Sequence, residues 1–213
     1  MENQMIIDTP GDNDKNIVDS TFCISAKYLL GLSHFCSTEQ SYYSGEFNGI
    51  LIEKKDGNIR LVASDGTILG LYDLRAENGD TIDWIDGASG EYTTTIPIID
   101  FMVVVKEACK NKRMDKVRIT LNGKVKMEYL GTIKECEALK VSDLAKYEQV
   151  FPKGDKLPIP GVALSISALA KINKALSILA GTIFFRLGFF SEDGPILITN
   201  GDENFKGLLM PCK

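Results

Sequence analysis

The sequence has little of the chemistry on which metal sites and active sites depend. It contains one histidine, His34, and its five cysteines are widely spaced with no Cys-x-x-Cys pair. A zinc site needs several such ligands at close spacing, so we expect reduced thiols and no metal. There is also no Gly-rich phosphate loop and no recognisable nucleophile constellation, although a Cys–His pair that meets only in space stays open. The sequence therefore predicts a protein that is not an enzyme and holds no cofactor.

Long apolar runs are also missing. No stretch approaches the roughly 18 uninterrupted apolar residues of a membrane-spanning helix. The first residues lack the basic start and apolar run of a signal peptide. We therefore expect a cytoplasmic protein with no membrane partner.

An excess of positive charge is missing as well. The chain has 24 Lys and Arg against 29 Asp and Glu, a net charge of −5. Residues 1–20 contribute −4 of this, and their Pro, Gly and Asn residues are typical of a disordered, solvated tail. The overall charge argues against non-specific coating of nucleic acid, but the nearly neutral remainder leaves room for a local basic surface.

Three segments of the chain share one layout. Each has a short β-prone run, a Ser or Pro, an amphipathic helix and then two or three strands. The segments begin at Phe22, Thr94 and Ala163, which are 72 and 69 residues apart. This spacing indicates duplicated supersecondary units rather than a solenoid, whose repeats are usually shorter.

Each unit carries a helix with a start signal and an apolar stripe. Ser25 is the N-cap candidate of the first helix, Pro97 suits the first position of the second, and Ser165 or Ser167 caps the third. In the first helix, Gly31 falls on a face other than the stripe. The three apolar stripes comprise Tyr28, Leu29, Leu32, Phe35 and Cys36, then Ile98, Met102, Val105 and Cys109, and finally Leu169, Ile172, Leu176 and Leu179.

Between the helices the pattern changes to antiparallel strands. Residues 49–74 predict three strands, with a turn at Asp65–Gly66, because Asp-Gly between alternating apolar runs is a strong hairpin signal. The second unit repeats the pattern around an Asn122–Gly123 turn. Residues 76–91 and 152–161 are rich in Gly, Pro and charge and are predicted linkers. The fold class is therefore α+β.

These boundaries divide the chain into three parts. The predicted parts are an acidic tail at 1–20, a complete domain at 21–152 made of units 21–76 and 91–152, and a third unit at 153–213 that amounts to half a domain.

Several ordered motifs resemble one known family. The run 49–74, with a strand that ends at Ser64-Asp65-Gly66, resembles the middle domain of bacterial DNA polymerase III β sliding clamps. The segment AKYEQVFPKGD resembles that domain's closing segment, and FKGLLMPCK resembles the clamp's C-terminal end. The resemblance implies the DNA-clamp fold, a ring of β-α-β-β-β units with helices lining a central hole and antiparallel sheets outside. It implies a DNA polymerase processivity factor in DNA replication.

The resemblance implies that cations on the helices face duplex DNA without reading its sequence. A sliding ring needs diffuse contacts to phosphates rather than base contacts. The alternative is that these lysines are solvated helix faces. The candidate DNA-facing residues are Lys27, Lys106, Lys110, Lys112, Arg113, Lys171 and Lys174.

The second implied surface is a hydrophobic pocket that captures short linear peptides of the polymerase and the clamp loader. An adaptable Met suits such recognition, whereas the alternative is that Ile68, Leu69 and Leu209 are core strand residues. Thr67 and Ile68 depart from the family's usual polar or basic pair. The candidate pocket residues are Phe47, Ser64, Gly66, Ile68, Leu69, Pro152, Leu208, Leu209, Met210 and Pro211.

An unpaired half-domain predicts a homo-oligomer, because it would leave a sheet edge and an apolar helix face exposed. If the family's twelve-unit ring is kept, four chains of three units supply it as a tetramer. A clamp-like adaptor or decoy that binds clamp-binding peptides without encircling DNA is the alternative. Catalysis is the least favoured hypothesis, because Asp65 is explained by the needs of its turn.

Overall fold

The computed structural model describes residues 20–37, 46–55, 58–74, 83–86, 91–139, 143–153, 163–179, 181, 184–191, 194–200 and 204–211. The predicted acidic tail lies outside these residues except for Ser20, and so do Cys212, Lys213 and most of both predicted linkers.

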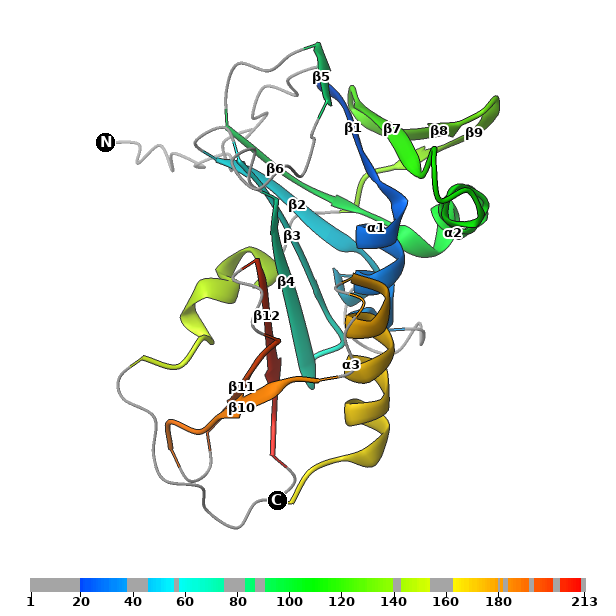
Figure 1. Cartoon of the computed structure of the whole chain (residues 1–213). Coiled ribbons are helices and arrows are strands. Elements are labelled where there is room, and N and C mark those ends of the chain that lie inside the picture. The colour runs from blue at the N-terminus through cyan, green and yellow to red at the C-terminus, as the bar shows by residue number, and fades with distance from the viewer. Residues whose placement is uncertain are drawn as a thin grey trace, which may run out of the picture.

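Helices and antiparallel strands alternate along the chain as the α+β prediction requires (Figure 1). The strands are β1 (Ser20–Ser25), β2 (Ile50–Lys55), β3 (Asn58–Ser64), β4 (Ile68–Leu74), β5 (Asp83–Asp86), β6 (Tyr92–Ile96), β7 (Lys116–Leu121), β8 (Lys124–Tyr129), β9 (Thr132–Glu137), β10 (Arg186–Gly188), β11 (Ile196–Thr199) and β12 (Phe205–Leu209). The helices are α1 (Ala26–Leu32), α2 (Ile98–Lys110) and α3 (Ile166–Leu179), with short 3-10 helices η1 (Ser33–Phe35), η2 (Glu46–Asn48) and η4 (Asp143–Gln149).

The first two units exchange their first strands. In one sheet the order is β5-β1-β7-β8-β9, so β1 of the first unit pairs with β7 of the second. In the other sheet the order is β10-β11-β12-β4-β3-β2-β6, so β6 of the second unit pairs with β2 of the first. Neither unit therefore completes its sheet alone.

The third unit extends the sheet of the first. Strand β12 pairs antiparallel with β4, with Leu208 opposite Leu69. The prediction of a short β-prone run at Ala163 is wrong, because residues 163–165 do not form a strand. The physical reason is the exchange seen in the other units: a first strand pairs in the sheet of a partner unit, and the third unit has no such partner in the described chain.

One predicted linker contains a strand. Within 76–91, β5 (Asp83–Asp86) pairs antiparallel with β1. Strand β1 pairs with β7 along its other edge, and β5 completes the sheet on the edge that remains. Backbone groups on that edge need partners, which favours a strand despite the polar composition of the segment.

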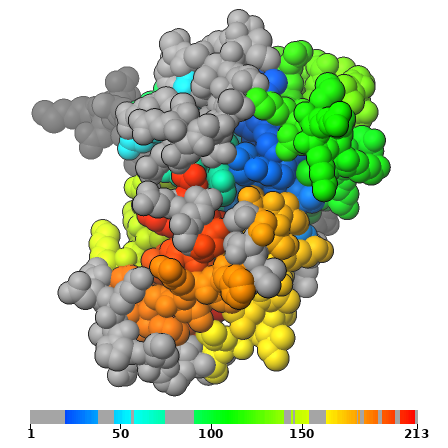
Figure 2. Space-filling model, in the orientation of Figure 1, coloured from blue at the N-terminus to red at the C-terminus, as the bar shows by residue number. Residues whose placement is uncertain are grey.

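The three helices stand together along one side of the molecule, with α1 between α2 and α3 (Figures 1 and 2). Ser25 is the N-cap of α1, as predicted, and its side chain accepts a hydrogen bond from the Lys27 backbone N–H. The Ser165 Oγ accepts a bond from the Ala168 backbone N–H, which selects Ser165 as the cap of α3. The second helix begins at Ile98, so Pro97 lies one residue before the position predicted for it.

Helices α1 and α3 approach closely at Gly31. A Cβ added there would lie 2.3 Å from the Leu179 Cγ. Gly31 is buried, so the prediction that it falls away from the packed face is wrong. A small residue permits this approach, and the interface joins the first unit to the third.

The seven-stranded sheet is covered on both faces over β4. Side chains of successive strand residues point to opposite faces. Ile68 and Tyr72 pack in the large core beneath the helices, whereas Leu69 and Leu71 pack in a second apolar cluster with η4. The second cluster lies on the sheet face that points away from the helices.

Candidate functional site

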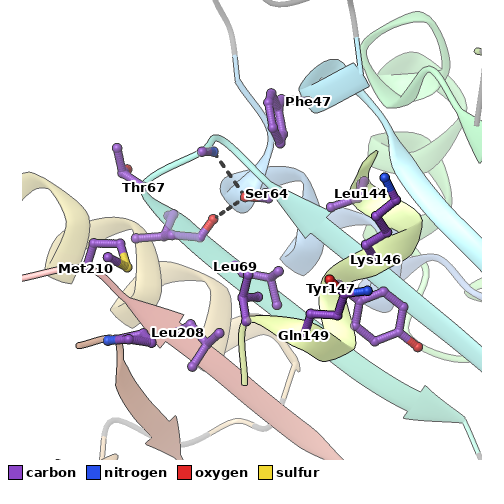
Figure 3. Close-up of a pocket in the computed structure, with 14 residues that line it drawn as sticks. Phe47, Ser64, Thr67, Leu69, Leu144, Lys146, Tyr147, Gln149, Leu208 and Met210 are labelled. Atoms are coloured by element: carbon purple, nitrogen blue, oxygen red, sulfur yellow. Dashed lines mark hydrogen bonds between the residues drawn. The ribbon is translucent and has the colours of Figure 1, made fainter. Parts of the chain in front are cut away.

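A cavity of about 320 Å³ opens on the sheet face that carries the second apolar cluster (Figure 3). It lies between the Asp65–Gly66 turn, η4 and the end of β12. All three units contribute to its walls. Its lining residues are Phe47, Ser64, Gly66, Thr67, Ile68, Leu69, Leu144, Lys146, Tyr147, Gln149, Val150, Pro195, Leu208 and Met210.

The wall nearest the sheet is the turn between β3 and β4. Gly66 has a φ of 87°, a backbone conformation that residues other than glycine rarely adopt. The Asp65 Oδ1 accepts hydrogen bonds from the backbone N–H groups of Thr67 and Ile68, both at 3.0 Å, and from the Thr67 hydroxyl at 2.7 Å. The Asp-Gly pair therefore supplies the local hydrogen bonds and the positive φ that fix the turn.

Three further hydrogen bonds, from two residues that line the cavity, hold this turn. The Ser64 hydroxyl donates to the Ile68 carbonyl at 2.8 Å and accepts from the Gly66 N–H at 3.0 Å. The Met210 N–H donates to the Thr67 carbonyl at 3.2 Å. The C-terminal strand of the third unit is thus tied to the turn of the first.

The opposite wall is η4, which an ion-pair network anchors to the sheet. The Arg60 guanidinium pairs with Glu148 at 2.7 Å and donates to the Tyr147 hydroxyl at 3.3 Å. That hydroxyl donates to Glu53 at 2.7 Å. Burial raises the pKa of Tyr147, and Glu53 adds to the rise although Arg60 opposes it. The hydroxyl therefore stays protonated at neutral pH and keeps its bond to Glu53.

The floor of the cavity is apolar. Leu69, Leu144, Tyr147 and Leu208 belong to the second apolar cluster and are all buried. Among the described lining residues, Lys146 is the only side chain that is charged at neutral pH. An open apolar floor of this kind suits the apolar side chains of a ligand.

Seven predicted pocket residues line this cavity together: Phe47, Ser64, Gly66, Ile68, Leu69, Leu208 and Met210. The structure does not place Pro152, Leu209 or Pro211 among the lining residues. Leu209 follows Leu208 on β12, so it points to the opposite sheet face and packs in the large core. Ile68 lines the cavity and also belongs to that core, so the two interpretations of it are not exclusive.

The residues that sequence reasoning missed come mainly from η4. Tyr147 and Val150 stand in the segment that carried the family resemblance, so that segment was the available signal. Leu144 lies three residues before Tyr147, a spacing that places both on one side of a helix. No sequence motif predicts that Pro195 lines the cavity, because only the fold of the third unit brings it there.

The predicted DNA-facing residues are all exposed and come from the three adjacent helices or from the turn after α2. They are Lys27, Lys106, Lys110, Lys112, Arg113, Lys171 and Lys174. Three of them have partners within the protein: Lys27 lies 4.8 Å from the centroid of the Tyr28 ring, Lys110 pairs with Glu107 at 2.7 Å, and Lys171 pairs with Asp65 at 2.5 Å.

The cations of two helices converge on the only histidine. Burial lowers the pKa of His34, and the charges of Lys174 and Lys106 lower it further. Lys174 belongs to α3 and Lys106 to α2, whereas His34 follows α1. Lys106 and Lys174 therefore both lie near this imidazole, which their separate positions in the sequence do not reveal.

Within the ranges that the structure describes, no group of three or more His, Cys, Asp or Glu side chains could hold a metal ion. No helix in that part of the chain is long and apolar enough to cross a membrane.

No protein-family model matches the sequence, and no curated protein matches it. The solved DNA polymerase sliding clamp of Pseudomonas aeruginosa is similar over 97% of this chain and 69% of its own, with a TM-score of 0.68 and 17% identity. A clamp of the same organism bound to griselimycin is similar over 99% of this chain and 68% of its own, with a TM-score of 0.66 and 16% identity.

These similarities identify the fold as that of sliding clamps, which confirms the predicted DNA-clamp fold. The DNA polymerase III β subunit of Thermotoga maritima is also similar, over 96% of this chain and 69% of its own, with a TM-score of 0.64 and 15% identity. The predicted resemblance to bacterial DNA polymerase III β subunits is therefore confirmed.

Proposed function

We propose that the chain is a non-catalytic processivity factor of the sliding-clamp type. An oligomeric ring of this chain would encircle duplex DNA, and its cavity would bind peptides of a DNA polymerase and a clamp loader. One observation carries this proposal: the cavity opens on one face of the seven-stranded sheet, and α1 and α3 pack in the large core on its other face, with α2 beside α1 over the five-stranded sheet. That arrangement suits a ring with DNA inside and partners outside.

The number and kind of exposed cations support the DNA-facing side. Lys106, Lys112, Arg113 and Lys174 make no side-chain ion pair among the described residues, so phosphates would find them available. Each cation that neutralises one phosphate contributes about −0.9 to the slope of log affinity against log salt. Removing Lys106 and Lys174 together should therefore flatten that slope by about 1.8 units.

The incomplete third unit supports an oligomer. Its described residues include no first strand like those that the other two units exchange, and β10 ends its sheet in the same part of the chain. Strand β9 ends the other sheet, and all its residues except Cys136 are exposed. Unpaired edges of this kind invite pairing with another chain. A tetramer would supply twelve units.

The ring is tested by topology. Dissociated chains are mixed with a closed circular plasmid, allowed to assemble, and washed at high salt. A ring stays on the circle and slides off once the plasmid is cut. Equal loss from circular and linear DNA contradicts the clamp. If peptide binding then persists, the result favours the clamp-like adaptor or decoy.

The cavity is tested with two matched methionines. Met210 lines it and is 46% exposed, whereas Met114 is 56% exposed and lies elsewhere. Griselimycin, which the P. aeruginosa clamp binds, is the probe. Met210→Ala should weaken its binding about 5- to 30-fold, the effect of losing one buried side-chain contact, and Met114→Ala should not change it. Equal effects of the two variants in calorimetry, or no binding at all, contradict the peptide site.

A further inference from the structure

One contact joins the two proposed functional surfaces. The Lys171 Nζ on α3 lies 2.5 Å from the Asp65 Oδ2 in the turn of the cavity wall. The two residues are 106 positions apart in the sequence and belong to different units. The sequence alone predicts that Lys171 faces DNA and explains Asp65 by the needs of its turn.

The Asp65 carboxylate has two separate tasks. Its Oδ1 holds the turn through Thr67 and Ile68, and its Oδ2 accepts from Lys171. Burial raises the pKa of Asp65, but the hydrogen bonds from Lys171, Thr67 and Ile68 outweigh it and lower the pKa below its usual value. The carboxylate is therefore ionised at neutral pH, with Lys171 as its counter-ion.

The two partners differ in their access to solvent. The Lys171 side chain is 46% exposed, whereas the Asp65 side chain is 9% exposed. A DNA phosphate can therefore reach the ammonium group, but water cannot fully replace it at the carboxylate. Losing the counter-ion leaves a poorly hydrated negative charge in the turn, which is unfavourable.

We propose that Lys171 is a positioning residue shared between the two surfaces, and that duplex DNA weakens binding at the cavity by drawing Lys171 away from Asp65. This inference rests on the proposed function. When Lys171 leaves Asp65, the turn loses its contact to α3. The same turn lines the cavity through Ser64, Gly66 and Thr67, so a change in the turn changes the cavity wall. Coupling is reciprocal, so a ligand in the cavity weakens DNA binding by the same factor.

The test measures griselimycin affinity with and without a saturating short linear duplex. In the wild-type chain, we expect DNA to weaken griselimycin binding about fivefold, because a partly exposed charge-assisted hydrogen bond contributes modestly. In Lys171→Met the affinity should be the same with and without DNA. In Lys171→Arg the DNA effect should return, because the cation is restored.

Two further variants separate coupling from simple turn stability. Asp65→Asn keeps an oxygen for the turn but removes the charge, so it should abolish the DNA effect and still bind griselimycin. Lys174 lies on the same helix but has no acidic partner in the described chain, so it serves as the matched control. Lys174→Met should weaken DNA binding, but at saturating DNA the effect on griselimycin should remain.

An unchanged DNA effect in Lys171→Met overturns the inference, as does a wild-type chain without any DNA effect. Weaker griselimycin binding in Lys171→Met with the same DNA effect as the wild type overturns it too, because Lys171 then only stabilises the turn. These outcomes leave the proposed peptide site intact. Failure of every variant and of the wild type to bind griselimycin refutes the peptide site and the inference together.

Discussion

Replacing Gly31 by Ala should destabilise the protein, although alanine is the better helix former. A Cβ at this position lies 2.3 Å from the Leu179 Cγ and 2.5 Å from its Cδ2. Leu179 is 4% exposed, so its side chain cannot rotate into solvent to avoid the added Cβ. Overpacking of a buried site costs about 1–3 kcal/mol, whereas Gly→Ala in a helix gains at most about 1 kcal/mol. We therefore expect a net loss of up to about 2 kcal/mol once the full propensity gain is subtracted.

The sign of this effect should reverse when Leu179 is shortened. Leu179→Ala alone should cost about 2–5 kcal/mol, because it leaves a cavity between α1 and α3. In that background the added Cβ of Gly31→Ala no longer clashes with a leucine side chain, so the substitution should stabilise by up to about 1 kcal/mol through helix propensity. The difference between the two backgrounds measures the contact directly.

The assay is equilibrium urea unfolding at one fixed protein concentration, since subunit association changes apparent stability. Ala170→Gly, at an exposed position of α3, calibrates helix propensity and should cost about 1 kcal/mol. If Gly31→Ala is stabilising in the wild-type background, or has the same effect in both backgrounds, the close packing of the first and third units through these helices is refuted.

Three other measurements follow from the side-chain environments. Adding duplex DNA should raise the pKa of His34 in an NMR titration, because phosphates offset the lysine charges that now lower it, and an unchanged pKa would place DNA elsewhere. Burial raises the pKa of Cys36 to about 12, so a disulfide reagent at neutral pH should modify the half-buried Cys23 first and reach Cys36 only after unfolding. Equal rates of modification of the two thiols would contradict this burial. Tyr147→Phe removes the hydroxyl that donates to Glu53 at 2.7 Å and should cost about 1–2 kcal/mol in urea unfolding, whereas no loss would show that packing alone holds η4.

The parts of the fold that sequence patterns predicted are those that local physics determines. The Asp65–Gly66 turn, the Ser25 cap and the β2, β3 and β4 strands depend on residues within a few positions of one another. Strand β5 escaped prediction because its four residues become a strand by pairing with β1. Residues 163–165 show the opposite case: their β-prone run forms no strand, because no sheet in the described chain pairs with it.

The same distinction between local and tertiary causes applies to the residues of the candidate site. Leu208 and Leu209 are indistinguishable by composition, and only the pairing of β12 decides which of them faces the cavity. Lys171 and Lys174 are likewise equivalent on the surface of a helix, and only the fold brings one of them to Asp65. Residue types and spacing predict the class of surface, whereas tertiary contacts assign the individual residues.

The exchange of first strands also constrains how the chain acquires its structure during synthesis. Phe22 in β1 pairs with Ile119 in β7, so the first strand must wait for 97 further residues to be made. At typical translation rates this delay is roughly 5–20 s. Throughout that interval β1 has no partner from the second unit. We therefore expect a high contact order, slow folding and a nascent chain that needs protection of its apolar strands from aggregation.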